Sequence, residues 1–447
     1  MPFDPVALPL EGGLVLRVAT EADRDRLVAF NAQIHRPPDA TGPADYIGSA
    51  VRRFIDGQAP GVGAGDFLLV EDPSSAEVAS SLCVLRQRWS YAGIPFAVDQ
   101  VEFVGTAPAY RRRGLVRLQF ELVHRRARQE GCPVEVVAGI DWYYRQFGYE
   151  YALQRTRGGR TLAALQGDDP GQAALRARPA TVEDIAFLTA AYQAGMTRYA
   201  VSVERDPDQW LDDLDDGDPD HWFRQVLSVI EDPSGRPLGF FGYLAFFHHP
   251  DDTDGQLRVG ALELAPGASW ATVGPPVLDC LRRHAATLGA ARGLPNPSVH
   301  LRLGDDHPAY DLTPGQAPDP LQGYVWYVRV GDLPGFLTGI APALEARLAA
   351  SAVAGHSGTL ALSFYRDGLK LRLDQGRLTS VERWPAPGQD PGDACFPDHT
   401  FLQLLFGYRS VPELEHAFPD CAVRDPSART VLDVLFPRQP SYTWLTI

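Results

Sequence analysis

The stretch Ala107–Val116, which reads APAYRRRGLV, decides how the N-terminal part of this 447-residue chain is expected to fold. It follows the apolar run Val101–Thr106, typical of a strand, and leads into apolar residues at helical spacing that begin with Leu115. The pattern predicts a strand, a tight turn and a helix. The first N–H groups of a helix lack intrahelical acceptors and carry the positive end of its dipole, and a glycine lets a ligand approach the backbone. Because the turn also holds three consecutive arginines, we expect it to bind phosphate.

The glycine pattern of this turn matches neither of the common nucleotide loops, GxxxxGK[ST] and GxGxxG. It resembles the acetyl-coenzyme A loop of the GNAT superfamily of N-acetyltransferases, whose core reads [QR]-x-x-G-x-[GA]. Here the core is Arg111-Arg112-Arg113-Gly114-Leu115-Val116, preceded by Pro108. Val116 stands where the general pattern has a small residue. For the loop alone, a basic helix start with a solvated face is the alternative interpretation.

The elements predicted around the loop follow the GNAT order of strand, helices, three antiparallel strands, loop and helix, strand, helical turn and strand. The segment Tyr143–Tyr149, YYRQFGY, resembles the signature Y-x-x-x-G-[FY], with Tyr144 in the tyrosine position. The resemblance covers about Leu14–Leu153. The predicted elements are strands at Leu14–Val18, Phe67–Glu71, Val78–Trp89, Val101–Thr106 and Val134–Ala138, and helices at Glu21–Gln33, Ala44–Asp56 and Gly114–Gln129.

A second segment repeats the first. Three pairs of similar segments, in the same order and at nearly the same spacing, indicate a duplicated domain. Arg178–Asp184 repeats Arg17–Asp23, Leu227–Gly235 repeats Phe67–Ser75, and Val259–Pro266 repeats Val101–Pro108. After Pro266 the copy reads GASWATVG and has no arginine, so we expect it to lack the coenzyme loop. A helix over Pro276–Leu288 should still follow, and Tyr324–Val330 should close its sheet. Such a unit would form one side of the acceptor site or an oligomer interface.

The last segment differs from both. Leu333–Ser351 has a helical pattern, and Gly358–Trp384 alternates as strands with hairpin turns at Arg366-Asp-Gly and Asp374-Gln-Gly. Helices near His399–Phe406 and Val411–Phe418 complete an α+β module. The module is similar to the sterol-carrier-protein-like domain that ends the Eis (enhanced intracellular survival) proteins. Those proteins carry GNAT, GNAT-like and sterol-carrier-like units in this order, and their loop also has a large residue after R-x-x-G-L.

We therefore expect a mixed α/β chain of the α+β class with three domains. Residues 1–155 would form the catalytic GNAT domain, residues 156–332 a second GNAT-like domain without the acetyl-CoA loop, and residues 333–447 the sterol-carrier-protein-like domain. The resemblance to Eis proteins also implies a homo-oligomer.

Composition narrows the possible partners. The formal charge of -15 argues against nucleic acid and would suit a cationic acceptor. The five cysteines are scattered without a CxxC pair, and the eleven histidines form no HExxH, so we expect neither a disulfide framework nor a metal site. The N-terminus lacks the features of a signal peptide, and no apolar run has the length of a membrane span. The expected location is the cytoplasm, with no membrane partner.

The resemblance implies acetyl-CoA as the acetyl donor and a small-molecule or peptide amine as the acceptor. The strand Phe103-Val104-Gly105-Thr106 would pair with the pantetheine arm as an added strand. The side chains of Arg111, Arg112 and Arg113 and the N–H groups from Arg113 to Val116 would hold the pyrophosphate. Tyr144 would protonate the coenzyme sulfur. The alternative for Tyr144 is an aromatic core residue, which is the role expected of Tyr143 and Tyr149.

The identity of the base stays open. Gln100 occupies the position at which some relatives carry a glutamate, and an amide cannot take a proton. Glu102, on the same strand face, could act through water or could be a solvated carboxylate. In Eis proteins the C-terminal carboxylate is the base, which here implies Ile447. For His35 we favour a surface or core position over catalysis.

Two classes of function compete. The first is an Eis-like N-acetyltransferase that acts on amines, including polycationic ones such as aminoglycosides and lysine side chains. The second is a non-catalytic binding or sensor protein that holds acyl-CoA or an apolar ligand. A transferase of another acyl group on the same fold is a third possibility, because fold does not determine function. The intact loop and Tyr144 favour the enzyme.

Overall fold

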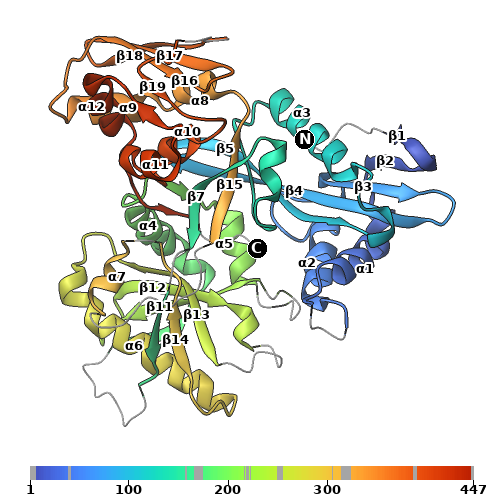
Figure 1. Cartoon of the computed structure of the whole chain (residues 1–447). Helices are drawn as coiled ribbons and strands as arrows, with labels where there is room; N and C mark the ends of the chain where they lie inside the picture. The colour runs from blue at the N-terminus through green and yellow to red at the C-terminus, as the bar shows by residue number, and fades with distance from the viewer. Residues whose placement is uncertain are drawn as a thin grey trace.

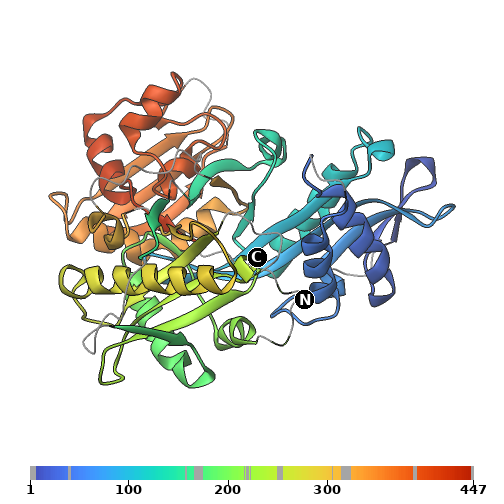
Figure 2. The same cartoon turned by 90° about the horizontal axis from the view of Figure 1, so that it is seen from below.

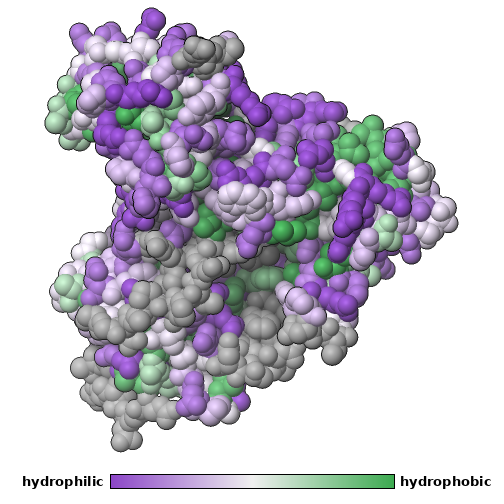
Figure 3. Space-filling view, viewed as in Figure 1, coloured by the Kyte–Doolittle hydropathy of each residue, from purple (hydrophilic) through white to green (hydrophobic). Residues whose placement is uncertain are grey.

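The computed structural model describes residues 7–38, 42–156, 159–165, 175–215, 217, 221, 223–248, 255–304, 306–313, 324–385 and 390–443. In these residues the strands form three sheets, of ten, six and five strands, and helices cover them (Figure 1). The expected mixed α/β architecture is confirmed. On the face in Figure 3, hydrophobic side chains gather over the N-terminal part, whereas the C-terminal part is mainly hydrophilic.

The first sheet is sandwiched between helices. The helices α1 (Arg24–Ile34) and α2 (Asp45–Ile55) pack on one face, and α3 (Leu115–Glu130) packs on the other (Figure 2). The predicted bounds of these elements are confirmed to within a few residues. The strand order is β1 (Ala7–Pro9), β2 (Val15–Val18), β3 (Phe67–Asp72), β4 (Glu77–Tyr91), β5 (Ile94–Thr106), β6 (Val134–Val137), β15 (Tyr324–Val330) and β7 (Glu150–Thr156), with β10 (Val201–Val203) beside β4 and β21 (Ser441–Tyr442) beside β10.

The second sheet repeats the strand order of the first. Its order is β8 (Arg160–Ala163), β14 (Ser298–Leu301), β13 (Gln256–Leu264), β12 (Pro237–Leu244), β11 (Gln225–Glu231) and β9 (Arg176–Pro179). Its helices are α4 (Ile185–Met196), α5 (Pro207–Leu214), α6 (Trp270–Ala291) and α7 (Pro308–Asp311). The helix α6 begins six residues before the predicted start at Pro276. Its buried face packs on the sheet although two prolines lie inside the helix, which the sequence pattern alone argues against.

One predicted strand lies in a different sheet. The expectation that Tyr324–Val330 closes the second sheet is wrong, because β15 pairs with β6 and β7 of the first sheet. The place beside β14 is taken by β8, with Val299 opposite Leu162. An alternating apolar strand requires a partner on each side, but its sequence does not specify which strand provides that partner.

The repeated sequence motifs form the same ion-pair network twice. In the first, Arg17 donates to Asp23 at 2.7 Å and to Glu71 at 2.6 Å. In the second, Arg178 donates to Asp184 at 2.7 Å and to Glu231 at 2.7 Å. Each network ties the start of the first long helix to the neighbouring strand. Burial raises the pKa of Asp23, but the hydrogen bonds from Arg17 and Thr20 outweigh this effect and lower the pKa to about 2.

The third sheet continues the core of the first. Trp89 on β4 contacts Trp326 on β15, with ring centroids 6.0 Å apart, and Tyr91 on β4 contacts Phe336 on α8 (Leu333–Gly339), with ring centroids 6.2 Å apart. The strand order is β18 (Arg377–Arg383), β17 (Gly368–Asp374), β16 (Gly358–Ser363), β19 (Ala394–Cys395) and β20 (Ala422–Val423), and the helices are α8 (Leu333–Gly339), α9 (Ala341–Ala349), α10 (Phe401–Leu405), α11 (Val411–Ala417) and α12 (Pro426–Leu435). The predicted turn at Asp374-Gln-Gly is confirmed, since Gln375 and Gly376 both have positive φ.

Candidate active site

The candidate site lies where two parallel strands of the first sheet separate. The pairing of β5 with β6 runs from Val98–Val134 to Val101–Val137; β6 then ends and β5 continues to Thr106. On its other side, this last part of β5 stays paired with β4. One backbone edge of β5 therefore borders a cavity of about 1010 Å³. An extended ligand can pair with such an edge as an added strand.

A β-bulge changes the direction of side chains at this point. The register between β4 and β5 shifts between Ser81 and Cys83, and Phe103 has a φ of 52°. Glu102 lies opposite Cys83, which packs in the core below α1 and α2, and Phe103 packs in that same core. Two consecutive residues thus face the α1–α2 side, which a regular strand does not allow.

The arginine-rich loop closes one end of the cavity. The backbones of Arg112 and Gly114 have the left-handed conformation, with φ of 63° and 74°. The backbone N–H groups from Arg112 to Val116 donate to no backbone carbonyl of the described chain. Arg111, Arg112 and Arg113 are exposed and pair with no carboxylate of the described chain. These N–H groups and guanidinium groups fit the diphosphate of a coenzyme. The predicted residues Phe103–Thr106 and Arg111–Val116 all line this one cavity.

Tyr144 also lines the cavity. Its side chain is 3% exposed, and its ring contacts Phe120, Tyr143 and Tyr327. Its hydroxyl is 3.6 Å from the position of a Cβ built on Gly139, on the segment that follows β6. Tyr143 also lines the cavity, whereas the hydroxyl of the fully buried Tyr149 lies 3.3 Å from Nε2 of His124.

A row of side chains leads along the sheet to Glu102. The indole N–H of Trp89 donates to Gln87 at 2.7 Å, the Gln87 amide donates to Gln100, and the Gln100 amide donates to Glu102 at 2.6 Å. The expectation that Gln100 and Glu102 share a face is therefore confirmed. Each group donates toward the cavity, so Gln100 orients the Glu102 carboxylate and cannot itself accept the proton of a substrate.

His35 is a residue of the site that sequence reasoning missed. It follows the last residue of α1 and lines the cavity together with Ile34 and with Ile47 of α2. In the sequence it is a single histidine before Pro37 and Pro38, which is typical of a loop. The approach of the α1 end to β5 is long-range, and no local pattern encodes it.

Ile447 lies outside the described residues, so the predicted role of its carboxylate stays a prediction. The nearest described residue is Thr443, whose hydroxyl accepts a hydrogen bond from Trp326 on β15 at 2.8 Å. Tyr327, the next residue on β15, contacts Tyr144. The end of the described chain is thus attached to the same sheet as the candidate site.

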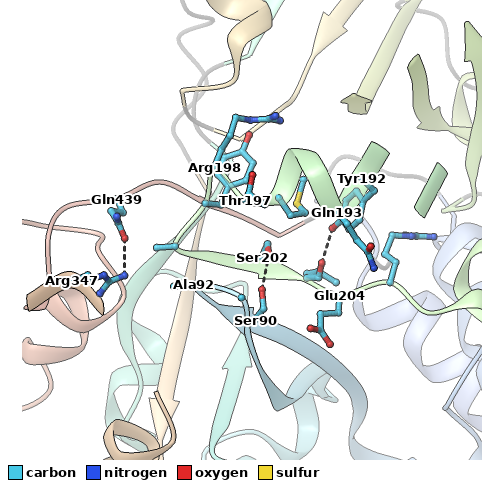
Figure 4. A pocket seen from close by; sticks show the side chains of 16 residues that line it. Ser90, Ala92, Tyr192, Gln193, Thr197, Arg198, Ser202, Glu204, Arg347 and Gln439 are labelled. Atoms are coloured by element: carbon cyan, nitrogen blue, oxygen red, sulfur yellow. Dashed lines mark hydrogen bonds between the residues drawn. The ribbon is translucent and has the colours of Figure 1, made fainter. Parts of the chain in front are cut away.

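A second cavity, of about 590 Å³, lies where the three sheets meet (Figure 4). Ser90 on β4 lies 3.0 Å from Ser202 on β10, which joins the N-terminal part to the middle part of the chain, and Arg347 on α9 donates to Gln439 at 2.9 Å within the C-terminal part. Arg198 pairs with Glu263 at 2.5 Å. The lining of this cavity comes from all three parts of the chain.

Among the described residues, no group of three or more histidine, cysteine, aspartate or glutamate side chains is placed to bind a metal ion. The helices of that same part of the chain include none with the length and apolarity needed to cross a membrane.

The chain resembles known acetyltransferases in sequence and in fold. Residues 16–152 match the family model of the acetyltransferase (GNAT) domain. No curated protein matches the sequence. A GCN5-related N-acetyltransferase from Kribbella flavida is 21% identical over 97% of this chain and 98% of its own, with a TM-score of 0.62. A GCN5-related N-acetyltransferase from Anabaena variabilis is 16% identical over 96% of this chain and 99% of its own, with a TM-score of 0.66. Eis1 from Mycobacterium abscessus is 18% identical over 97% of this chain and 100% of its own, with a TM-score of 0.55.

Residues 16–152 thus match a GNAT acetyltransferase domain, and the chain is an enzyme of the acyltransferase class. The structural neighbours share the fold over nearly the whole length of the chain.

Proposed function

We propose that this enzyme transfers an acetyl group from acetyl-CoA to a primary amine of a small molecule or peptide, with a cationic, multi-amine acceptor favoured by the net charge of -15. One observation carries the proposal: the arginine-rich loop, the unpaired edge of β5 and the buried Tyr144 line the same cavity. This combination supplies an anion cradle, a strand edge and a proton donor at one site.

The loop and β5 have separate roles in binding the donor. Arg111, Arg112 and Arg113, with the N–H groups from Arg113 to Val116, hold the diphosphate. Phe103, Val104, Gly105 and Thr106 offer their backbone edge to the pantetheine arm. The bound thioester supplies an activated acetyl group, and backbone N–H groups near the bulge can stabilise charge that develops on its oxygen.

Tyr144 protonates the departing sulfur. Its burial among aromatic rings positions the hydroxyl and keeps bulk water away from it. The C-terminal carboxylate of Ile447 is the base that the resemblance to Eis proteins implies. Thr443, the last described residue, accepts a hydrogen bond from Trp326 on β15, the strand whose Tyr327 contacts Tyr144. Glu102 attracts the acceptor cation.

The remaining units support this site. We infer that residues 156–332 form a second GNAT-like domain, since the second sheet repeats the strand order and the ion-pair network of the first. It lacks the arginine-rich loop and so binds no coenzyme. Residues 333–447 form a sterol-carrier-protein-like domain, residues 1–155 are the catalytic domain, and the enzyme functions as a cytoplasmic homo-oligomer.

The test is release of coenzyme A thiol from acetyl-CoA with aminoglycosides, polyamines and lysine peptides as acceptors. We expect acceptor-dependent turnover with at least one member of the panel. A chain that binds acetyl-CoA but transfers to none of them would contradict the proposal and favour a sensor of acyl-CoA or of an apolar ligand. Removal of Ile447 should lower kcat without changing the Kd for acetyl-CoA, and an unchanged kcat would exclude its carboxylate as the base.

A further inference from the structure

The second sheet splits at the position that corresponds to the candidate site of the first. The parallel pairing of β13 with β14 ends at Val259 and Leu301, and β13 continues to Leu264. In the repeated segments, Val259 corresponds to Val101, the last residue of β5 that pairs with β6. No residue of β12 lies opposite Gly260, so β13, like β5, has an extra residue just beyond the pairing. The duplicated fold thus provides a second split without an arginine-rich loop.

A side chain of the C-terminal strand β21 lies at this second split. The hydroxyl of Tyr442 donates a hydrogen bond to the backbone carbonyl of Gly260. The extra residue of a bulge is left out of the strand ladder, which frees its carbonyl for such a donor. Gly260 corresponds to Glu102, which lines the candidate site in the first sheet. A tyrosine of the chain itself therefore contacts the second sheet where the first sheet borders its cavity.

Packing holds the ring of Tyr442 in place. Its side chain is 5% exposed and lies in one core with Ala261 and Tyr199, whose ring centroid is 5.4 Å away. Burial raises the pKa of Tyr442, so the hydroxyl stays protonated and remains a donor. A buried hydroxyl without a partner is costly, and the Gly260 carbonyl supplies that partner. Ring and hydroxyl together therefore fix where this side chain lies.

The residues on either side of Tyr442 are attached to the first sheet. The hydroxyl of Ser441 donates to the carbonyl of Gln154 on β7 at 3.0 Å, and the hydroxyl of Thr443 accepts from Trp326 on β15 at 2.8 Å. The strand β21 itself runs parallel to β10. Three consecutive residues thus connect the end of the described chain to both sheets, and Tyr442 makes the connection to the second.

We infer that Tyr442 is a positioning residue: its seat on the second sheet fixes the point from which residues 444–447 leave, and thereby places the C-terminal carboxylate. This inference rests on the proposed function, in which the carboxylate of Ile447 is the base. A base has to lie within hydrogen-bond reach of the proton that it takes, and a misplacement of about 1 Å lowers a rate roughly 100-fold. The second GNAT-like unit then contributes to catalysis without binding a coenzyme, because it holds the chain end.

The test measures kcat and the Kd for acetyl-CoA in Tyr442→Ala and Tyr442→Phe, each in the full chain and in a chain that lacks Ile447. In the full chain we expect Tyr442→Ala to lower kcat roughly 100-fold and Tyr442→Phe, which keeps the ring, to lower it only about fivefold. The Kd for acetyl-CoA should stay within about twofold, and in the chain that lacks Ile447 either substitution should change kcat by less than about twofold, because Tyr442 acts through the missing carboxylate.

Tyr243→Phe is the matched control. It removes a hydroxyl from a side chain that is 2% exposed and packs on the other face of the same sheet, where it lies 3.0 Å from Nε2 of His248. This variant should leave kcat unchanged in both chains.

Equal fold losses of kcat from Tyr442→Ala in the two chains would overturn the inference, since Tyr442 would then act through stability alone. So would a full-length Tyr442→Ala with a kcat within about threefold of the wild type. If Tyr442→Ala does not fold, Tyr442→Phe decides in the same way, because its loss of kcat has to disappear in the chain that lacks Ile447. A wild type that acetylates no acceptor, or that keeps its kcat without Ile447, contradicts the proposed function and this inference with it, and both results are visible before any Tyr442 variant is compared.

Discussion

Gly105 and Ile34 lie so close together that the site has no room for a side chain on this part of β5. A Cβ at position 105 would fall 2.6 Å from Cγ2 of Ile34, well inside van der Waals contact. The contact ties the end of α1, and with it His35, to the strand that borders the cavity. The position of the α1 end relative to β5 therefore depends on this packing contact.

Gly105→Ala should push the end of α1 away from β5. We expect a loss of stability of about 1–3 kcal/mol and a larger relative loss of kcat/KM for the acceptor than for acetyl-CoA. Steady-state kinetics and thermal unfolding measure the two effects. Adding Ile34→Ala removes the atoms that clash, so the double variant should recover part of the lost activity. Further loss in the double variant would contradict this explanation.

Tyr144→Phe should lower kcat by roughly 100-fold or more, because the thiolate loses its proton donor while the aromatic packing is retained. The Kd for acetyl-CoA should change little. Tyr149→Phe is the matched control: it removes the hydroxyl of a buried tyrosine outside the cavity and should cost stability of about 1 kcal/mol without a comparable loss of kcat. Similar kcat values for the two variants would argue against a catalytic Tyr144.

Arg112→Ala should weaken acetyl-CoA binding by roughly 10-fold, since a hydrogen bond to a charged group contributes about 1.5–3 kcal/mol. The effect should shrink at high salt, because the guanidinium is exposed and screened. Isothermal titration with acetyl-CoA at two salt concentrations measures both quantities. Arg125→Ala, an exposed arginine further along α3, should leave the Kd unchanged. Equal losses of acetyl-CoA affinity in both variants would indicate that the arginines act through their overall charge, and that Arg112 makes no specific contact with the diphosphate.

Asp23→Asn should destabilise the first sheet by about 2 kcal/mol at pH 7, because the pKa of Asp23 is lowered from 3.8 to about 2 in the folded chain. A lowered pKa stabilises the fold above the unfolded value, and this stabilisation fades as the pH falls from about 4 toward 2. The gap in Tm between variant and wild type should therefore narrow at pH 3. Asp184→Asn tests the equivalent network in the second sheet, and a gap independent of pH would contradict the ion-pair origin.

The local sequence determined much of this protein. The Arg-x-x-Gly loop, the strand before it, the helix after it and the position of Tyr144 follow from periodicity, glycine placement and short motifs, which act over a few residues. The left-handed backbone conformations of Arg112 and Gly114 agree with the tight turn that the pattern predicts. The two copies of the Arg17 network likewise follow from a repeated motif.

Only the tertiary structure decided the rest. Strand β15 lies between β6 and β7, although its sequence would suit an interior position in either sheet. The bulge at Phe103 and the contact of Ile34 with Gly105 bring His35 to the cavity from 70 residues away along the chain. The energies of strand pairing and side-chain packing depend on which two surfaces come into contact. A local sequence pattern determines whether a surface is apolar or polar, but it does not determine which other surface packs against it.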